Sequence, residues 1–85
     1  MRLEIEAGAL NVLQRMQPKQ ARAMLERLRK IADDPFVNHT NVERMQGRKD
    51  AFRLRQGDWR AVYWIDREAL TLKVERIAPR GEVYK

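Results

Sequence analysis

The residues best suited to chemistry are the arginines of one short segment, FRLRQGDWRAVYWI, at positions 52–65. It contains Arg53, Arg55 and Arg60. A guanidinium group stays charged at neutral pH and binds two phosphate oxygens with matched geometry. Further positive charge lies just upstream, at Arg44, Arg48 and Lys49. This cluster indicates a surface that binds phosphate groups.

The segment reads as two strands joined by a tight turn, because Gly57 followed by Asp58 suits a two-residue hairpin loop. Directly paired residues of such a hairpin share a face, and the faces alternate along each strand. The predicted pairs are Gln56 with Trp59, Arg55 with Arg60, Leu54 with Ala61, and Arg53 with Val62.

This register separates an apolar face from a charged one. The apolar face suits a core and holds Phe52, Leu54, Ala61, Tyr63 and Ile65. The other face holds Arg53, Arg55, Arg60, Val62 and Trp64. Like charges opposite each other destabilise a sheet by about 0.2–1 kcal/mol, so the arginines favour a role in binding. The alternative is that each arginine pairs with an acid from elsewhere, such as Glu43 or Glu75.

Two residues near the C-terminus extend this candidate site. Arg80 follows the last apolar stretch, and Tyr84 comes four residues later. A tyrosine ring can stack on a nucleic-acid base, and its hydroxyl can assist at a reacting phosphate. The alternative for Tyr84 is simple packing over the edge of the sheet.

Composition narrows the class of function. A chain of 85 residues makes one small domain, residues 1–85. Lys and Arg number 18 against 12 Asp and Glu, and the net charge of +6 favours an anionic partner such as nucleic acid, an acidic protein or a membrane surface. Cysteine is absent, and the single histidine, His39, reads as a solvated loop residue. We therefore expect neither a metal nor a cofactor.

The sequence shows no sign of export or of membrane insertion. The opening MRLEIEAGAL has no apolar run long enough for a signal peptide. No segment approaches the ~20 apolar residues of a membrane-spanning helix. A cytoplasmic protein with no membrane partner is the expectation.

Hydrophobic periodicity predicts the elements that position the arginines. Residues 2–6 alternate as in a short strand, and helical spacing then begins at Ala9. Pro18 suits the first turn of a second helix, which should end before Pro35. Residues 36–50 show no clear period and predict a loop. The hairpin follows, and then a further strand near residues 70–77.

The predicted order is strand, helix, helix and three strands, which indicates an α+β domain of β-α-α-β-β-β type. The late connections are too short for crossovers, so the last three strands should form an antiparallel meander. The N-terminal strand and the helical hairpin should pack on one face of this small antiparallel sheet. The arginines would then lie on the open face.

The sequence resembles the RelE/ParE superfamily of toxins from bacterial and archaeal toxin–antitoxin pairs. The most specific segments are RLRQGDWRAVYWID and the terminal RGEVY, and the similarity extends over AGALNVLQRM and LERLRKIADDP. The resemblance implies the same β-α-α-β-β-β fold and one of two activities. RelE-like members cut mRNA in the ribosomal A site, whereas ParE-like members inhibit DNA gyrase and cleave nothing.

The resemblance also implies roles for individual residues. RelE-type members carry two basic residues on the first hairpin strand, an arginine opening the second, an arginine after the last strand and a tyrosine near the end. The matching positions here are Arg53, Arg55, Arg60, Arg80 and Tyr84, which favours the nuclease. The implied catalytic set is Arg55, Arg60, Arg80 and Tyr84. The candidate RNA-binding set is Arg53 together with the upstream cations that widen the positive field, Arg48, Lys49 and Arg44.

In the implied reaction the RNA 2′-hydroxyl attacks the adjacent 3′-phosphate without a metal, and the arginines stabilise the developing charge. One departure affects the general base. The best-known RelE-type members have lysines at the positions of Arg53 and Arg55, and an arginine does not lose its proton. The candidates for the base are Tyr84, Glu43, Glu82, and groups of the ribosome or the RNA.

The resemblance implies a cognate antitoxin, RelB-like or similar. Such partners are often acidic and disordered until they bind. The antitoxin usually binds operator DNA, so the toxin would reach that DNA only indirectly. Two other functions compete with the mRNA nuclease: a gyrase inhibitor of ParE type, and a plain nucleic-acid-binding module without toxicity.

Overall fold

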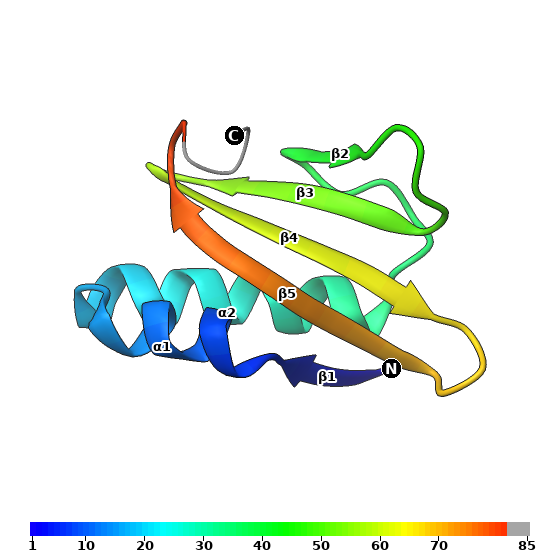
Figure 1. Cartoon of the computed structure of the whole chain (residues 1–85), viewed down its shortest axis with the longest axis horizontal. Helices are drawn as coiled ribbons and strands as arrows, with labels where there is room; N and C mark the ends of the chain where they lie inside the picture. The colour runs from blue at the N-terminus through cyan, green and yellow to red at the C-terminus, as the bar shows by residue number, and fades with distance from the viewer. Residues whose placement is uncertain (82–85) are drawn as a thin grey trace.

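The computed structural model describes residues 1–81 and shows two helices packed on a five-stranded sheet (Figure 1). The elements in chain order are β1 (Arg2–Ile5), α1 (Ala7–Arg15), α2 (Pro18–Asp33), β2 (Val42–Arg44), β3 (Ala51–Gln56), β4 (Trp59–Asp66) and β5 (Thr71–Pro79). The strands lie in the order β1-β5-β4-β3-β2 across the sheet. The predicted α+β class is confirmed.

The sheet is mixed rather than wholly antiparallel as expected. Strands β3, β4 and β5 form the predicted antiparallel meander, but β1 pairs in parallel with β5. Both helices separate β1 from the later strands, and so long a connection allows parallel pairing. Strand β2, antiparallel to β3, lies in the stretch expected to be a loop. Its three residues are too few to show a period.

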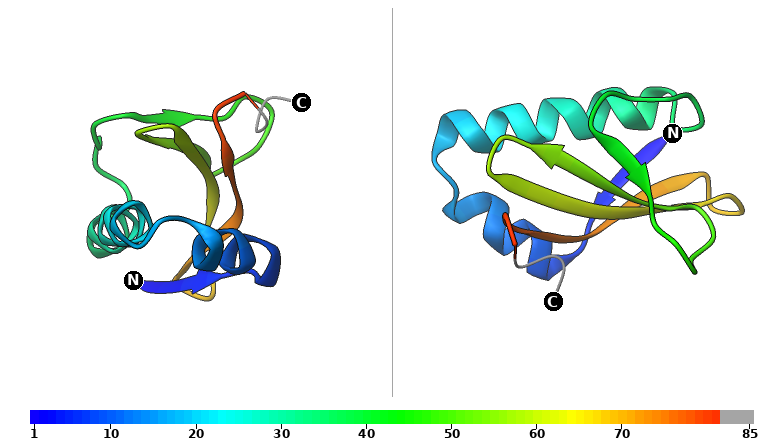
Figure 2. Two further views of the ribbon diagram at one scale, coloured as in Figure 1. Left: turned by 90° about the vertical axis from the view of Figure 1, so that its left-hand side faces the viewer. Right: turned by 90° about the horizontal axis from the view of Figure 1, so that it is seen from above.

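The helices begin and end close to the predicted positions. Helix α1 buries Ala9 and Leu13. Pro18 occupies the first turn of α2, and the helix ends at Asp33, just before the dipeptide that contains Pro35. The buried face of α2 consists of Met24, Leu28, Ile31 and Ala32. The helical hairpin backs the twisted sheet, and α1 packs close to β5 (Figure 2).

The core lies between the helices and the facing side of the sheet. The sheet contributes Leu54, Tyr63, Leu72 and Val74, each no more than 1% exposed. Burying one such side chain stabilises the fold by about 1.5–3 kcal/mol. The ring of Phe52 stacks on Tyr63 at a centroid distance of 5.3 Å. Burial raises the pKa of the Tyr63 phenol to about 12.

The β3–β4 hairpin has the predicted register, with Arg55 opposite Arg60 and Arg53 opposite Val62. Gly57 has φ of +59°, a conformation that glycine adopts without the steric cost of a side chain. The pairing of β4 with β5 is interrupted between Val62 and Tyr63. Glu75 is the extra residue of this β-bulge, and bulges often redirect side chains next to functional sites.

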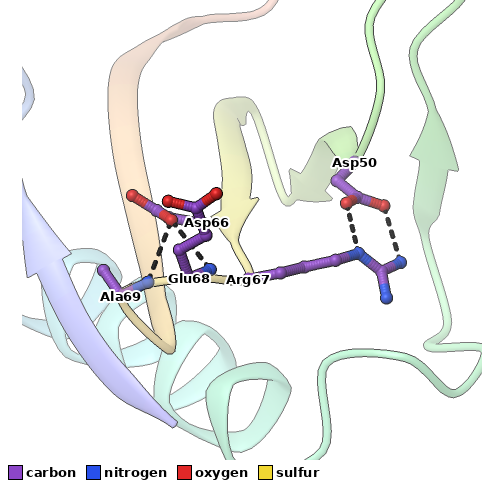
Figure 3. A network of polar contacts seen from close by, with 5 residues as sticks. All are labelled: Asp50, Asp66, Arg67, Glu68 and Ala69. Atoms are coloured by element: carbon purple, nitrogen blue, oxygen red, sulfur yellow. Dashed lines mark hydrogen bonds and ion pairs between the residues drawn. The ribbon is translucent and has the colours of Figure 1, made fainter.

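Side-chain contacts hold the β2–β3 connection against the β4–β5 turn (Figure 3). Asp50 is buried and accepts two hydrogen bonds from Arg67, at 2.6 and 3.0 Å. The hydrogen bonds from Arg67 lower the pKa of the Asp50 carboxyl. In the turn itself, Asp66 Oδ1 accepts the backbone N–H groups of Glu68 and Ala69. The connection that carries Arg48 and Lys49 is therefore anchored at one end.

Candidate nucleic-acid interface

Arg53 and Arg55 lie on the open face of the sheet, where they line a small hollow of about 50 Å³ together with Asn41 and Glu43. Glu43 of β2 is directly opposite Arg53 of β3, so its carboxylate shares that face. The hollow thus combines two guanidinium groups with one carboxylate. Chemically, this combination of groups suits the binding of an anion next to a proton acceptor.

Asn41 positions Arg55 in this hollow. Arg55 donates from Nη2 to Oδ1 of Asn41 at 2.8 Å, and its backbone N–H donates to the Asn41 carbonyl at 2.9 Å. Asn41 has φ of 63°, a left-handed conformation that asparagine tolerates better than most residues. The sequence did not predict this contact, because residues 36–50 were expected to be a loop. The only signal in the sequence was that Asn41 comes directly before the apolar residue Val42.

Arg60 differs from the expectation that three exposed guanidinium groups converge. It lies opposite Arg55 in the ladder, yet it is only 7% exposed. Its Nη1 donates to the carbonyl oxygens of Gly57 and Trp59, both at 2.9 Å, so the side chain braces the hairpin turn.

The buried position of Arg60 leaves its charge poorly compensated. Within residues 1–81 no carboxylate forms an ion pair with it, and its Nε has no hydrogen-bond partner. A buried N–H without a partner costs about 1–3 kcal/mol. An anion bound at the adjacent Arg55 would compensate part of the Arg60 charge.

Arg48 forms an ion pair with Glu75, which is the residue of the β5 bulge. Its Nη2 lies 2.7 Å from Oε1, and its Nη1 donates to Oε2 at 3.0 Å. The hydrogen bond with Glu75 raises the pKa of Arg48. Glu75, which was considered as a partner for the hairpin arginines, therefore pairs with Arg48, upstream of the hairpin.

The remaining candidate site residues lie in different parts of the structure. Arg44 lies over the ring of Phe52, 5.6 Å from its centroid, so the structure places it on the helix-facing side, away from Arg53. Lys49 is exposed in the β2–β3 connection. Arg80 is exposed after β5, and its backbone N–H donates to the Asp58 carbonyl at 2.8 Å, which brings it beside the hairpin turn. Tyr84 and Glu82 lie outside the described residues.

No group of three or more His, Cys, Asp or Glu side chains that could hold a metal occurs within residues 1–81. His39 is half-buried, and its Nε2 lies 2.7 Å from the Asp34 carbonyl oxygen, so it is less solvated than expected. Among the described helices, none has the length and apolar character that crossing a membrane requires.

The fold is similar to that of a class of small toxins. The chain is similar to RelE in the RelE–RelB complex from Pyrococcus horikoshii OT3, with 25% identity, a TM-score of 0.81, and 95% of this chain and 96% of that chain covered. It is similar in fold to the isolated Escherichia coli RelE toxin, with 22% identity, a TM-score of 0.78, and 98% and 89% covered. The YoeB/ParE toxin from Agrobacterium tumefaciens has 18% identity, a TM-score of 0.78, and 94% and 99% covered.

The family follows from the sequence itself. The model of the ParE toxin of the type II toxin–antitoxin system parDE matches residues 3–84. The chain belongs to this family and is a type II toxin of the RelE/ParE superfamily, as the resemblance implied. A comparison with curated proteins gave no match.

Proposed function

We propose that this toxin is an mRNA endoribonuclease that acts on the ribosome and needs no metal. The observation that carries this proposal is the hollow that Glu43 shares with Arg53 and Arg55. A binding module needs only the two cations. A carboxylate held among them suits a reaction in which a proton must leave a hydroxyl beside a phosphate.

In the proposed reaction Glu43 takes the proton of the RNA 2′-hydroxyl, whose oxygen attacks the adjacent phosphorus. The bond to the 5′-oxygen breaks, and that oxygen takes a proton from water, which leaves a cyclic phosphate on one fragment and a 5′-hydroxyl on the other. Glu43 is preferred as the base because Arg53 and Arg55 cannot give up a proton and both lie next to it.

The arginines stabilise the charge that builds on the phosphoryl oxygens. Arg55 is exposed and oriented by Asn41, so it is the best placed to contact them. Arg60 adds its buried charge from the position opposite Arg55, and Arg80 contributes from beside the hairpin turn. Arg53, Arg48 and Lys49 bind flanking phosphates, and Tyr84 stacks on a base or assists proton transfer.

The proposed setting is the bacterial or archaeal cytoplasm, with mRNA in the ribosomal A site as substrate. The proposed partner is a cognate antitoxin, because the similar Pyrococcus horikoshii toxin was seen in complex with RelB. An acidic antitoxin suits a toxin with a net charge of +6. Operator DNA would be reached only through that antitoxin.

Inhibition of DNA gyrase is the second candidate function. The description of the matching family, a ParE toxin, favours it. Arginines in place of both lysines also favour it, because a gyrase inhibitor needs no group that loses a proton.

Two assays on the purified toxin separate the candidates. In a translating extract, primer extension should show mRNA cleavage that depends on ribosomes, while gyrase supercoiling stays normal. Glu43→Gln should slow cleavage by about 10²–10⁴-fold, whereas Glu26→Gln, on the exposed side of α2, should cleave normally. Intact mRNA with blocked supercoiling would establish the gyrase function instead. Undiminished cleavage by folded Glu43→Gln would show that the base lies elsewhere.

A further inference from the structure

The turn of the β3–β4 hairpin extends over the first turns of α2, and a pocket of about 220 Å³ lies between them (Figure 2). The pocket is on the helix-facing side, because Trp59 shares that side of β4 with Ala61. It is therefore separate from the Glu43 hollow on the open face. Its lining consists of Lys19, Gln20 and Ala23 of α2, Gln56 of β3, Gly57 and Asp58 of the turn, and Trp59 of β4.

Trp59 provides the aromatic part of the pocket. Its side chain is half-buried against the core, so its position is fixed while part of it remains accessible. The indole Nε1 donates a hydrogen bond to Oε1 of Gln20 at 3.2 Å, which ties the ring to α2. An aromatic ring held in this way can stack on a nucleobase without losing conformational freedom.

The contact with Trp59 also determines the orientation of the Gln20 amide. An indole N–H can only donate, so the amide oxygen faces Trp59 and the two N–H groups of Nε2 are directed elsewhere. Across residues 1–81, no hydrogen bond uses Gln20 Nε2. Gln20 therefore brings hydrogen-bond donors to the pocket, next to the ammonium group of Lys19.

Asp58 brings an acceptor from the opposite wall. Its backbone carbonyl accepts the N–H of Arg80 at 2.8 Å, so the residue is held in place by a tertiary contact. The side chain is exposed, and within the described part of the chain its carboxylate takes part in no ion pair. A carboxylate accepts N–H groups on two oxygens. The pocket thus combines donors from α2 with a two-point acceptor from the turn.

Guanine is the nucleobase whose edges match both walls. It has two acceptors, O6 and N7, on one edge, and two donors, N1–H and the N2 amino group, on the neighbouring edge. Adenine has an amino group where guanine has O6, and it has none at C2. Uracil offers a carboxylate only one N–H, and cytosine offers only its N4 amino group.

We infer that this pocket binds the guanine base of a nucleotide, stacked on Trp59, with O6 and N7 toward Gln20 and N1–H and the N2 amino group toward Asp58. The exposed side chains of Lys19 and Arg80 neutralise the phosphate. The nucleotide is either a free guanosine phosphate or a guanosine of single-stranded RNA, because both present the same base and phosphate. The inference does not rest on the nuclease chemistry, since the pocket and the hollow lie on opposite sides of the sheet.

Tryptophan fluorescence of the full-length toxin tests this inference. Trp64→Phe leaves Trp59 as the only tryptophan of the chain. Guanosine monophosphate (GMP) should quench its emission and bind at least tenfold more tightly than AMP, CMP or UMP. A uridine-rich 2′-O-methyl RNA, which cannot be cleaved, is measured with and without a single guanosine. Quenching by GMP would identify free nucleotides as ligands, and quenching by the guanosine-containing RNA alone would identify RNA.

Asp58→Asn provides a test of specificity. Asparagine suits a turn position, and its amide offers one acceptor and one donor in place of two acceptors. The variant should bind GMP at least tenfold more weakly and should prefer xanthosine monophosphate, whose C2 carbonyl accepts the amide N–H. A role of Asp58 in the turn alone would not produce this exchange of preference.

Gln20→Glu removes the donor from the other wall and should also weaken GMP binding at least tenfold. Gln14→Glu makes the same change of charge at an exposed position of α1 outside the pocket, so it should bind like the wild type. Circular dichroism establishes that each variant is folded.

The outcomes separate this inference from the proposed function. Equal binding of the four monophosphates, or no quenching by either GMP or the guanosine-containing RNA, would overturn it. A folded Asp58→Asn protein that still preferred GMP to xanthosine monophosphate would overturn it as well. None of these measurements involves ribosomes or cleavage, so such results would leave the proposed nuclease standing. Intact mRNA in the translating extract would, in turn, leave the guanine pocket standing.

Discussion

The side chains on the two faces of the β3–β4 hairpin differ in the interaction partners that the folded chain gives them. On the helix-facing side, Leu54 and Ala61 are paired and fully buried, and they pack only against other parts of the core. On the open side, Arg55 and Arg60 are paired, and their only oxygen partners among the described residues are an asparagine and two backbone carbonyls. The helix-facing side therefore needs no ligand, whereas the open side carries positive charge that an anionic ligand can neutralise.

This difference separates residues that fold the protein from residues that act. Adjacent positions on one strand alternate between the two roles, since Leu54 lies between Arg53 and Arg55. Substitutions one residue apart should therefore affect different measurements. Arg60 belongs to both groups, because it is buried and braces the turn while it lies opposite Arg55 in the β3–β4 ladder.

The largest expected effect on stability comes from the helix-facing side. Leu54→Ala removes a fully buried side chain, and such changes cost about 2–5 kcal/mol. Urea unfolding followed by circular dichroism should show the loss, and toxicity should fall with the amount of folded protein. Leu10→Ala, at a position 39% exposed, is the matched control and should change stability little. A Leu54→Ala protein as stable as the wild type would contradict the assignment of this face to the core.

Arg55→Ala should lower the activity of the toxin and leave its stability nearly unchanged, the opposite of Leu54→Ala. The side chain is exposed, so stability should change by less than about 0.5 kcal/mol. The cleavage rate should fall by about 10²–10³-fold, or roughly 2.7–4 kcal/mol of transition-state stabilisation. Primer extension on programmed ribosomes measures the rate, with Arg22→Ala on the exposed side of α2 as control. Full cleavage by folded Arg55→Ala would remove Arg55 from the site.

Comparison of the wild type with Tyr63→Phe at alkaline pH should test the burial of Tyr63 on the helix-facing side. Burial raises the pKa of Tyr63 from 10.0 to about 12, so folding favours the neutral phenol. This contribution is complete below pH 10 and is lost as the pH rises through 12, and its size is on the order of 3 kcal/mol. Tyr63→Phe removes it, so the difference in unfolding free energy between the two proteins should shrink or reverse over that range. Parallel profiles would show that the folded state does not resist ionisation of Tyr63.

Local patterns were enough to predict most of the fold. Both helices have a clear stripe of apolar residues, and the Gly57–Asp58 turn determined the hairpin register correctly. The parallel pairing of β1 and the existence of β2 were not predicted. Each depends on contacts between distant segments, and β2 has only three residues, so no local period reveals it.

The candidate site was only partly predictable. Alternation placed Arg53 and Arg55 on the correct face, and it also placed Arg60 there. It did not reveal that Arg60 is buried, because burial depends on what covers the centre of the sheet. Arg44 was grouped with the site because it is close in sequence, yet β2 turns it toward Phe52 on the other face.

The smallest expected effect concerns the ion pair between Arg48 and Glu75, which links the two ends of the open face. The pair is partly exposed, with side chains 42% and 30% accessible, so breaking it should cost no more than about 1 kcal/mol. Its two single substitutions should nevertheless have different effects on RNA binding. If Arg48 contacts an RNA phosphate, Arg48→Ala should lower the affinity and reduce the slope of log affinity against log salt by about 1.

Glu75→Gln breaks the same pair but leaves Arg48 in place and removes a negative charge. The affinity for a single-stranded RNA should therefore rise or stay unchanged, although the stability of the toxin falls as it does for Arg48→Ala. Fluorescence anisotropy at several salt concentrations measures both variants, with Glu68→Gln in the β4–β5 turn as a control for charge alone. If both variants weakened binding equally, the pair would serve to hold the β2–β3 connection in place, and Arg48 would belong with the residues that fold the protein.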